Sequence, residues 1–167
     1  MSIDVRPCSN KDMEVLRSGD VAPSDLRHHE ERWASQLRQE AVYLLAWRGA
    51  RVVGRVTLLL RSRYPQVRSV LADGAELNAL EARPQGQGIG TALILAGEQE
   101  ARRRAAPILG LAVQVQNNGA RRLYERLGYA LWEHGLVIDR WTQFDDNGRV
   151  VKEHADKCFY LTKQPGT

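Results

Sequence analysis

A glycine-rich stretch, residues 85–91 (QGQGIGT), constrains this chain more than any other part of the sequence. A mostly apolar run at residues 75–82 comes before it, and apolar residues at helical spacing follow from Ile89. Glycines at alternate positions leave backbone N–H groups uncovered at the positive end of that helix, where they form an anion site. The stretch therefore predicts a ligand that carries phosphates. The alternative is a tight strand-to-helix turn without a ligand.

Two familiar phosphate-binding motifs do not match this stretch. The Walker A loop ends in Gly-Lys-Ser/Thr, whereas here no lysine precedes Thr91. The dinucleotide fingerprint spaces its glycines as G-x-G-x-x-G, whereas Gly86, Gly88 and Gly90 follow G-x-G-x-G. Neither motif therefore identifies the ligand.

Length and composition favour one folded domain, residues 1–167, in the cytoplasm. Of its 167 residues, 43% are hydrophobic and 26% are charged, which suits a single globular domain. A formal charge of +4, with acidic residues among the basic ones, suits an anionic ligand and does not indicate nucleic acid. The sequence has neither a signal-peptide core nor an apolar run of about 18 residues, so we expect no membrane contact. We expect buried free thiols at Cys8 and Cys158, and a disulfide between them is the alternative.

Hydrophobic periodicity and turn residues predict a mixed α/β order of elements. A capping box at Ser9 opens a helix that ends near Gly19. Further helices are expected at residues 23–39, 89–104 and 119–127. Strands are expected at residues 3–6, 41–47, 52–60, 75–82, 108–113, 129–144 and 157–163. Residues 61–74 are mostly polar and predict a long connection, and residues 145–148 predict a turn.

A second block, residues 113–129, follows one helix and one strand after the glycine-rich stretch. It matches the signature Asn-x-x-Ala-x-x-Leu-Tyr-x-x-x-Gly-Phe/Tyr at Asn117, Ala120, Leu123, Tyr124, Gly128 and Tyr129. The glycine-rich stretch matches the pattern Gln/Arg-x-x-Gly-x-Gly/Ala at Gln85, Gly88 and Gly90. With both blocks in this order, the chain resembles the GCN5-related N-acetyltransferases (GNAT superfamily). It departs from them at Ala82, where proline is frequent, and at Gln85, where arginine is commoner.

The resemblance implies a fold and a reaction. The fold is α/β, a central and mostly antiparallel twisted sheet with one splayed parallel pair, flanked by helices. The reaction is acetyl transfer from acetyl-CoA, as co-substrate, to an amine that attacks the thioester directly. The pyrophosphate is expected on the backbone of the glycine-rich stretch, and the pantetheine arm along the end of strand 75–82. A backbone N–H near Leu80 is expected to stabilise the oxyanion.

The resemblance also assigns roles to single residues. Tyr124 matches the usual proton donor to the departing thiolate, and the alternative is a core tyrosine. Asn117 matches a position that contacts the cofactor or caps the helix. The residues expected at the cofactor are Asn78, Ala79, Leu80, Gln85, Gly86, Gln87, Gly88, Ile89, Gly90, Thr91, Asn117 and Tyr124.

A general base is also expected, because a protonated amine cannot attack. Several members of the family carry the base on the strand before the glycine loop. Strand alternation puts Glu76, Asn78 and Leu80 on one side, and Leu77, Ala79 and Glu81 on the other. Glu76 is therefore the candidate base, and the alternative is a solvated carboxylate at the start of the strand. Glu81 is disfavoured because alternation places it on the opposite side.

The histidines do not indicate a metal site. His28 and His29 are adjacent, so on a helix they diverge by about 100° and cannot share a metal as i, i+4 partners do. We expect them on the solvated surface, with lining of the acceptor pocket as the alternative.

The leading hypothesis is an N-acetyltransferase that acts on a primary amine of a small molecule, either a metabolite or an aminoglycoside-like antibiotic. The alternatives are a peptide or protein N-terminus as acceptor, and a non-catalytic acyl-CoA-binding protein. No nucleic-acid or membrane partner is expected. Dimers are common in the family, so a homodimer is one expected oligomeric state. No exposed apolar stripe in the sequence identifies its interface.

Overall fold

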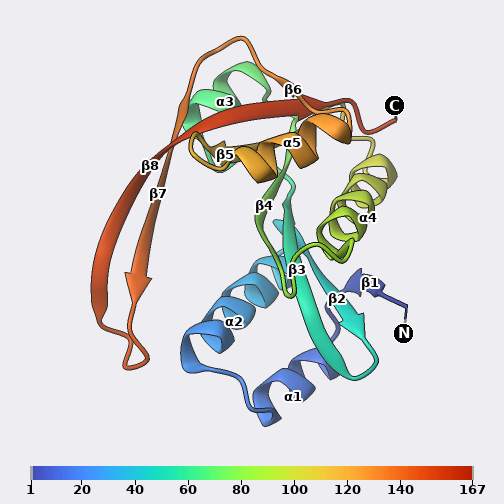
Figure 1. The fold of residues 1–167 in the computed structure, drawn as a ribbon, viewed down its shortest axis with the longest axis vertical. Helices are drawn as coiled ribbons and strands as arrows, with labels where there is room; N and C mark the ends of the chain where they lie inside the picture. The colour runs from blue at the N-terminus through green and yellow to red at the C-terminus, as the bar shows by residue number, and fades with distance from the viewer. Residues whose placement is uncertain (1, 167) are drawn as a thin grey trace.

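The computed structural model describes residues 2–166, in which eight strands join one sheet (Figure 1). The helices are α1 (Asn10–Ser18), α2 (Pro23–Leu37), α3 (Pro65–Val70), α4 (Ile89–Arg103) and α5 (Asn118–Arg126). The strands are β1 (Asp4–Pro7), β2 (Ala41–Arg48), β3 (Arg51–Leu59), β4 (Ala75–Ala82), β5 (Leu109–Gln114), β6 (Ala130–Leu131), β7 (Val137–Phe144) and β8 (Val150–Lys163). The strand order is β1-β2-β3-β4-β5-β8-β6, with β7 paired to β8.

One parallel pair interrupts an otherwise antiparallel sheet. β4 and β5 run parallel, and their register covers only Ala75 with Leu109, Glu76 with Gly110, and Leu77 with Leu111. Beyond Leu77 and Leu111 the two strands continue but no longer pair with each other, so the sheet splays open between them. The mixed sheet with a splayed parallel pair confirms the predicted fold class.

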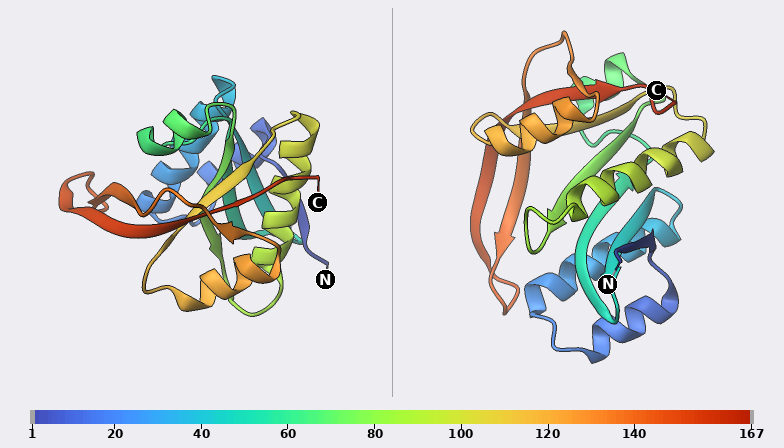
Figure 2. Two further views of the ribbon diagram at one scale, coloured as in Figure 1. Left: turned by 90° about the horizontal axis from the view of Figure 1, so that it is seen from above. Right: turned by 45° about the vertical axis from the view of Figure 1, so that its right-hand side comes forward.

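Helices cover both faces of the sheet (Figure 2). On one face, α4 and α5 pack on the main core, to which β3 contributes Val56 and Leu58 and β4 contributes Leu77. On the other face, α1 and α2 pack on a second core that includes Tyr43 of β2. The faces are named here the α4 face and the α2 face. Thr57, which lies between Val56 and Leu58, belongs to the α2 face because side chains alternate along a strand.

A bulge in β4 changes which side chains share a face. Asn78 pairs with Thr57 and Glu81 pairs with Arg55, so β4 has one more residue than β3 in this interval. Ala79 has a positive φ of 55°. Leu80 consequently returns to the main core beside Leu77, and Glu81 lies on the α2 face. The prediction that Glu81 lies opposite Glu76 was therefore wrong, because strict alternation ends at a bulge.

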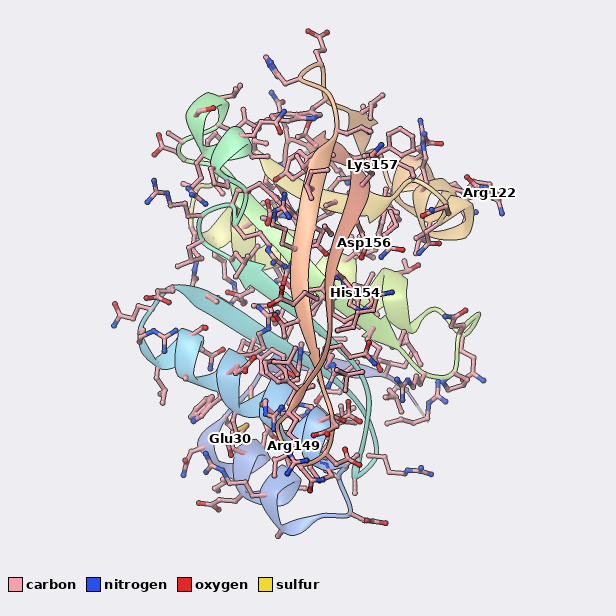
Figure 3. All side chains as sticks on the ribbon, turned by 90° about the vertical axis from the view of Figure 1, so that its left-hand side faces the viewer. Glu30, Arg122, Arg149, His154, Asp156 and Lys157 are labelled. Atoms are coloured by element: carbon pink, nitrogen blue, oxygen red, sulfur yellow. The ribbon has the colours of Figure 1, made fainter. Side chains whose placement is uncertain are left out.

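Other differences from the expected elements lie outside the two matched blocks. Residues 61–74 contain the short helix α3, whose first residue is Pro65. The strand expected at residues 129–144 is divided into β6 and β7, and the last strand begins at Val150. β7 and β8 form a long hairpin that Figures 1 and 3 show running from the β5 side of the sheet to α2. Cys8 and Cys158 are buried free thiols, as predicted.

Candidate active site

A small cavity of about 110 Å³ lies where β4 and β5 separate. It passes through the sheet, because its lining combines Leu80 and Tyr124 of the main core with Asn78 and Asp139 from the other side. Asn78 and Ala79 of the bulge border it, so backbone groups freed from the β4–β5 ladder face an enclosed space. Such a gap accepts an extended ligand that pairs with a strand edge.

A second cavity of about 560 Å³ lies between the glycine-rich loop and α5. Gly86 and Gly88 adopt positive φ values of 77° and 76°, and a Cβ at either would meet no atom within 4 Å. Gly88 is the N-cap of α4, and no side chain caps this helix. The first-turn N–H groups are thus free for an anion at the positive end of the helix dipole.

Most of the predicted cofactor residues line these two cavities. The larger cavity is lined by Leu80, Gln85, Gly86, Gly88, Ile89, Gly90, Thr91, Asn117 and Tyr124 from the predicted set. Gln87 lines neither, because its side chain accepts a 2.8 Å hydrogen bond from Arg48. Arg126 also lines the larger cavity and is absent from the residues predicted from the sequence. In the sequence, Arg126 is a basic residue in the last turn of α5. The helix dipole alone explains such a residue, so it did not indicate a ligand site.

Tyr124 lies where the two cavities meet, since both are lined by Leu80 and Tyr124. The side chain is 8% exposed and its ring packs edge-to-face against Tyr129 at 6.3 Å. Its hydroxyl makes no hydrogen bond with a described residue, whereas the Tyr129 hydroxyl donates to Glu98 at 3.0 Å. Burial raises the pKa of Tyr124 to about 12, so the phenol keeps its proton at neutral pH. A protonated and unpaired hydroxyl is suited to donate a proton to a ligand in the cavity.

Asn117 caps α5. Its side-chain oxygen accepts a 3.1 Å hydrogen bond from the N–H of Ala120, and the residue also lines the larger cavity. Capping is thus observed, and a contact with a ligand remains open to the amide nitrogen of the same side chain.

Glu76, the candidate base, lies inside the protein. It is 0% exposed and lines neither cavity. Its Oε2 accepts hydrogen bonds from the hydroxyls of Ser62 and Tyr160, the latter at 2.7 Å, and its Oε1 accepts one from the Arg63 N–H at 3.2 Å. Burial raises its pKa, against the opposing effect of these donors. The alternative of a solvated carboxylate is wrong, because the side chain joins a buried network with Ser62 and Arg63, which precede α3, and with Tyr160 of β8.

The α2 face carries several charged side chains that form ion pairs. Arg55 forms ion pairs with Asp25 at 3.2 Å and with Glu81 at 2.9 Å. Arg63 lies 3.0 Å from Asp139, an ion pair whose geometry is not that of a hydrogen bond. Asp139 is the carboxylate residue that lines the small cavity among the described residues.

The two adjacent histidines, His28 and His29, lie on α2. They were expected on the solvated surface, but the structure buries them in part or fully. His29 is 5% exposed and its Nδ1 lies 2.7 Å from the Tyr43 hydroxyl. Burial lowers the pKa of His28 to about 3 and that of His29 to about 4, so both are neutral at pH 7. Within residues 2–166, no group of His, Cys, Asp and Glu could hold a metal ion. In the same range, no helix is long and apolar enough to cross a membrane.

Comparison with known proteins gives a consistent result. The model of the acetyltransferase (GNAT) family matches residues 11–129. A mycothiol acetyltransferase from Nocardiopsis dassonvillei is 47% identical over 53 residues, which are 32% of this chain and only 16% of that protein. A ribosomal-protein-alanine N-acetyltransferase from Brucella melitensis has a TM-score of 0.65 at 18% identity, covering 96% of this chain and 98% of the other. YncA, a putative acetyltransferase from Salmonella typhimurium solved with acetyl-CoA, has a TM-score of 0.62 at 18% identity, covering 98% and 94%.

Proposed function

This chain belongs to the acetyltransferase (GNAT) family, and from that premise we propose that it transfers an acetyl group from acetyl-CoA to a primary amine of a small molecule. The observation that carries the proposal is the position of Tyr124, which joins the glycine-loop cavity to the gap between β4 and β5. A phosphate site, a narrow gap and a proton donor lie there in the order in which acetyl-CoA presents its pyrophosphate, its pantetheine arm and its thioester.

The residues present fit this co-substrate. The uncapped N-terminus of α4 and the open space beside Gly86 and Gly88 suit the pyrophosphate. Arg126 brings a positive charge to the same cavity. The backbone of the β4 bulge from Asn78 to Leu80, which does not pair with β5, suits the pantetheine amides and the thioester oxygen.

The proposed transfer consists of one bond exchange and two proton transfers. The amine nitrogen forms a bond to the thioester carbon while the carbon–sulfur bond breaks. Tyr124 donates its proton to the departing sulfur. Because its pKa is raised, the phenol keeps its proton until the thiolate forms beside it. Asp139 receives the proton that the amine loses, directly or through water, since it lines the cavity on the acceptor side. In this proposal Asp139 replaces Glu76, which has no access to the cavity.

The β7–β8 hairpin supports a small acceptor. Its tip contacts α2, with the Arg27 guanidinium 5.0 Å from the Phe144 ring centre. Nearer the cavity, Arg63 donates a 2.7 Å hydrogen bond to the Arg140 carbonyl. Figure 3 shows the hairpin, with His154 and Asp156 on β8, in front of the sheet. A hairpin held at both places covers the approach to Asp139, whereas a protein N-terminus needs an open groove. The likeness to the Brucella enzyme keeps a protein acceptor as the competing candidate.

One set of measurements tests the proposal. Titration calorimetry with acetyl-CoA should give saturable one-to-one binding, and a panel of small amines and peptides should show thiol release with the amines only. Tyr124→Phe should lower kcat about 100-fold or more and leave the Kd of acetyl-CoA unchanged. Tyr129→Phe, which removes the neighbouring buried hydroxyl outside both cavities, is the matched control. Activity confined to peptides would refute the small acceptor, and an unaltered kcat in Tyr124→Phe would refute the proton donor.

A further inference from the structure

Arg32 is a half-buried arginine that forms no ion pair with a described residue, although several charged side chains surround it. It lies on α2, one turn after His28 and therefore on the same side of the helix. Its guanidinium makes no hydrogen bond or ion pair with a described residue, and its Nε is buried. Burial lowers its pKa, and the neighbouring charges of Arg63 and Arg55 lower it further. A desolvated guanidinium without a hydrogen-bond or ion-pair partner destabilises the folded protein, unless a ligand supplies that partner.

The carboxylates near Arg32 pair with other arginines and not with Arg32. Arg55 is matched by Asp25 and Glu81, and Arg63 by Asp139. The carboxylate whose charge raises the pKa of Arg32 is that of Glu31, the preceding residue, which is exposed. His28 and His29 are neutral and so do not change this balance. Arg32 therefore has no carboxylate partner among the described residues, and its guanidinium is available to a carboxylate of a ligand.

The same face offers unpaired atoms for a second polar group. Asn78 lies in the wall of the small cavity, and its Oδ1 is buried without a partner. The Oγ1 of Thr57, which pairs with Asn78 across β3 and β4, is also buried without a partner. The Tyr43 ring, opposite Thr57 on β2, lies 6.1 Å from the His28 ring. His28 of α2 thus packs on Tyr43, and Tyr43, Thr57 and Asn78 are successive neighbours across β2, β3 and β4, ending at the small cavity.

We propose that the acceptor is an amine that also carries a carboxylate, with the carboxylate bound by Arg32 and the amine directed toward Asn78 and the thioester. The inference rests on the proposed function, because it describes the acceptor of that same reaction. The planar guanidinium binds a carboxylate through two parallel hydrogen bonds, which fixes orientation as well as charge. The amine hydrogens find an acceptor in Asn78 Oδ1. Such a molecule gives a partner to the Arg32 guanidinium and to Asn78 Oδ1, two of the groups that the folded chain leaves unpaired.

Matched acceptor pairs test this inference. Amino acids are compared with their carboxamides, and 4-aminobutyrate with butylamine, by the rate of thiol release from acetyl-CoA. We expect kcat/KM to be about 10- to 100-fold higher for the carboxylate of each pair, the range of a charge-assisted hydrogen bond. Arg32→Gln should bring this ratio close to one, chiefly through KM. Arg38→Gln, which removes an exposed charge paired with Glu40 just after α2, should keep the ratio of the wild type.

The outcomes separate this inference from the proposed function. Equal rates within each pair, or a ratio that Arg32→Gln does not change, would refute the role of Arg32 and leave the acetyltransferase proposal standing. Acetylation of the neutral amines alone would refute it in the same way. If acetyl-CoA binds and no amine of any pair is acetylated, both proposals fail. Arg32→Lys gives a further check, because a lysine keeps the charge but not the two-pronged geometry and should restore only part of the ratio.

Discussion

Replacement of Glu76 separates its observed structural position from the catalytic role that the sequence suggested. The carboxylate is fully buried and accepts hydrogen bonds from the Ser62 hydroxyl, the Tyr160 hydroxyl and the Arg63 N–H. Glu76→Leu removes all the acceptors and leaves these donors inside the protein. Glu76→Gln keeps the volume and one oxygen, but it turns an NH₂ group toward at least one of the donors.

The expected loss of stability follows from these contacts. An unpaired buried donor costs about 1–3 kcal/mol, so Glu76→Leu should cost about 3 kcal/mol after relief of the buried carboxylate is subtracted. For a chain of 167 residues, that loss lowers Tm by about 6–12 °C. Glu76→Gln should cost about 1 kcal/mol, the value of one mismatched hydrogen bond.

The pH dependence has a definite sign. The pKa of Glu76 is raised above its ordinary value of 4.5, so the folded protein holds this proton more tightly than the unfolded chain. Stability from this group is full below pH 4.5 and falls as the pH rises through the folded pKa. The slope is at most about 1.4 kcal/mol per pH unit. Glu76→Gln lacks this titration, so the stability of the wild type relative to this variant should fall with rising pH.

Urea denaturation followed by circular dichroism, at several pH values above 4.5, measures these differences. Acetyl-CoA binding and turnover are measured on the same preparations, at a temperature where each variant is folded. Both variants should bind acetyl-CoA and retain turnover, because Glu76 does not line the cavities. A large loss of kcat with an unchanged Tm would refute the structural role and return Glu76 to the position of a base. A flat pH dependence of the stability difference would refute the raised pKa.

Three further substitutions and one pH profile test other parts of the structure. Gly110→Ala places a Cβ 2.1 Å from the Tyr160 hydroxyl and should destabilise by about 1–3 kcal/mol in urea denaturation. Gly119→Ala, in α5 with no atom closer than 4.0 Å, should instead stabilise by about 0.5–1 kcal/mol. Gly88→Ala, at a φ of 76° in open space, should cost about 1 kcal/mol and raise the Kd of acetyl-CoA in calorimetry. Because the pKa of Tyr124 is about 12, kcat should show no alkaline fall from this group below about pH 10; such a fall, absent in Tyr124→Phe, would contradict its placement.

The sequence alone determined the parts of the molecule that depend on local chain chemistry. The capping box at Ser9, the bounds of β4 and the start of α4 at Ile89 agree with the structure because caps, alternation and helical spacing act over a few residues. The glycine-rich loop was assigned in the same way, since only glycine readily adopts the positive φ seen at Gly86 and Gly88. The placement of Tyr124 in α5 and of Asn117 at the N-cap of α5 followed from the second block.

Only the tertiary structure decided the environment of the charged residues. The bulge at Ala79 arises from pairing with β3, and it reversed the predicted face of Glu81. Glu76 is buried by Ser62 and Tyr160, which lie 14 and 84 residues away in sequence. The hairpin of β7 and β8 brings Asp139 to the small cavity. Alternation and motif matching describe one segment at a time, whereas burial, ion pairing and pKa depend on which distant segments meet. For that reason the sequence located the glycine-rich loop, and the structure was needed to find Arg32.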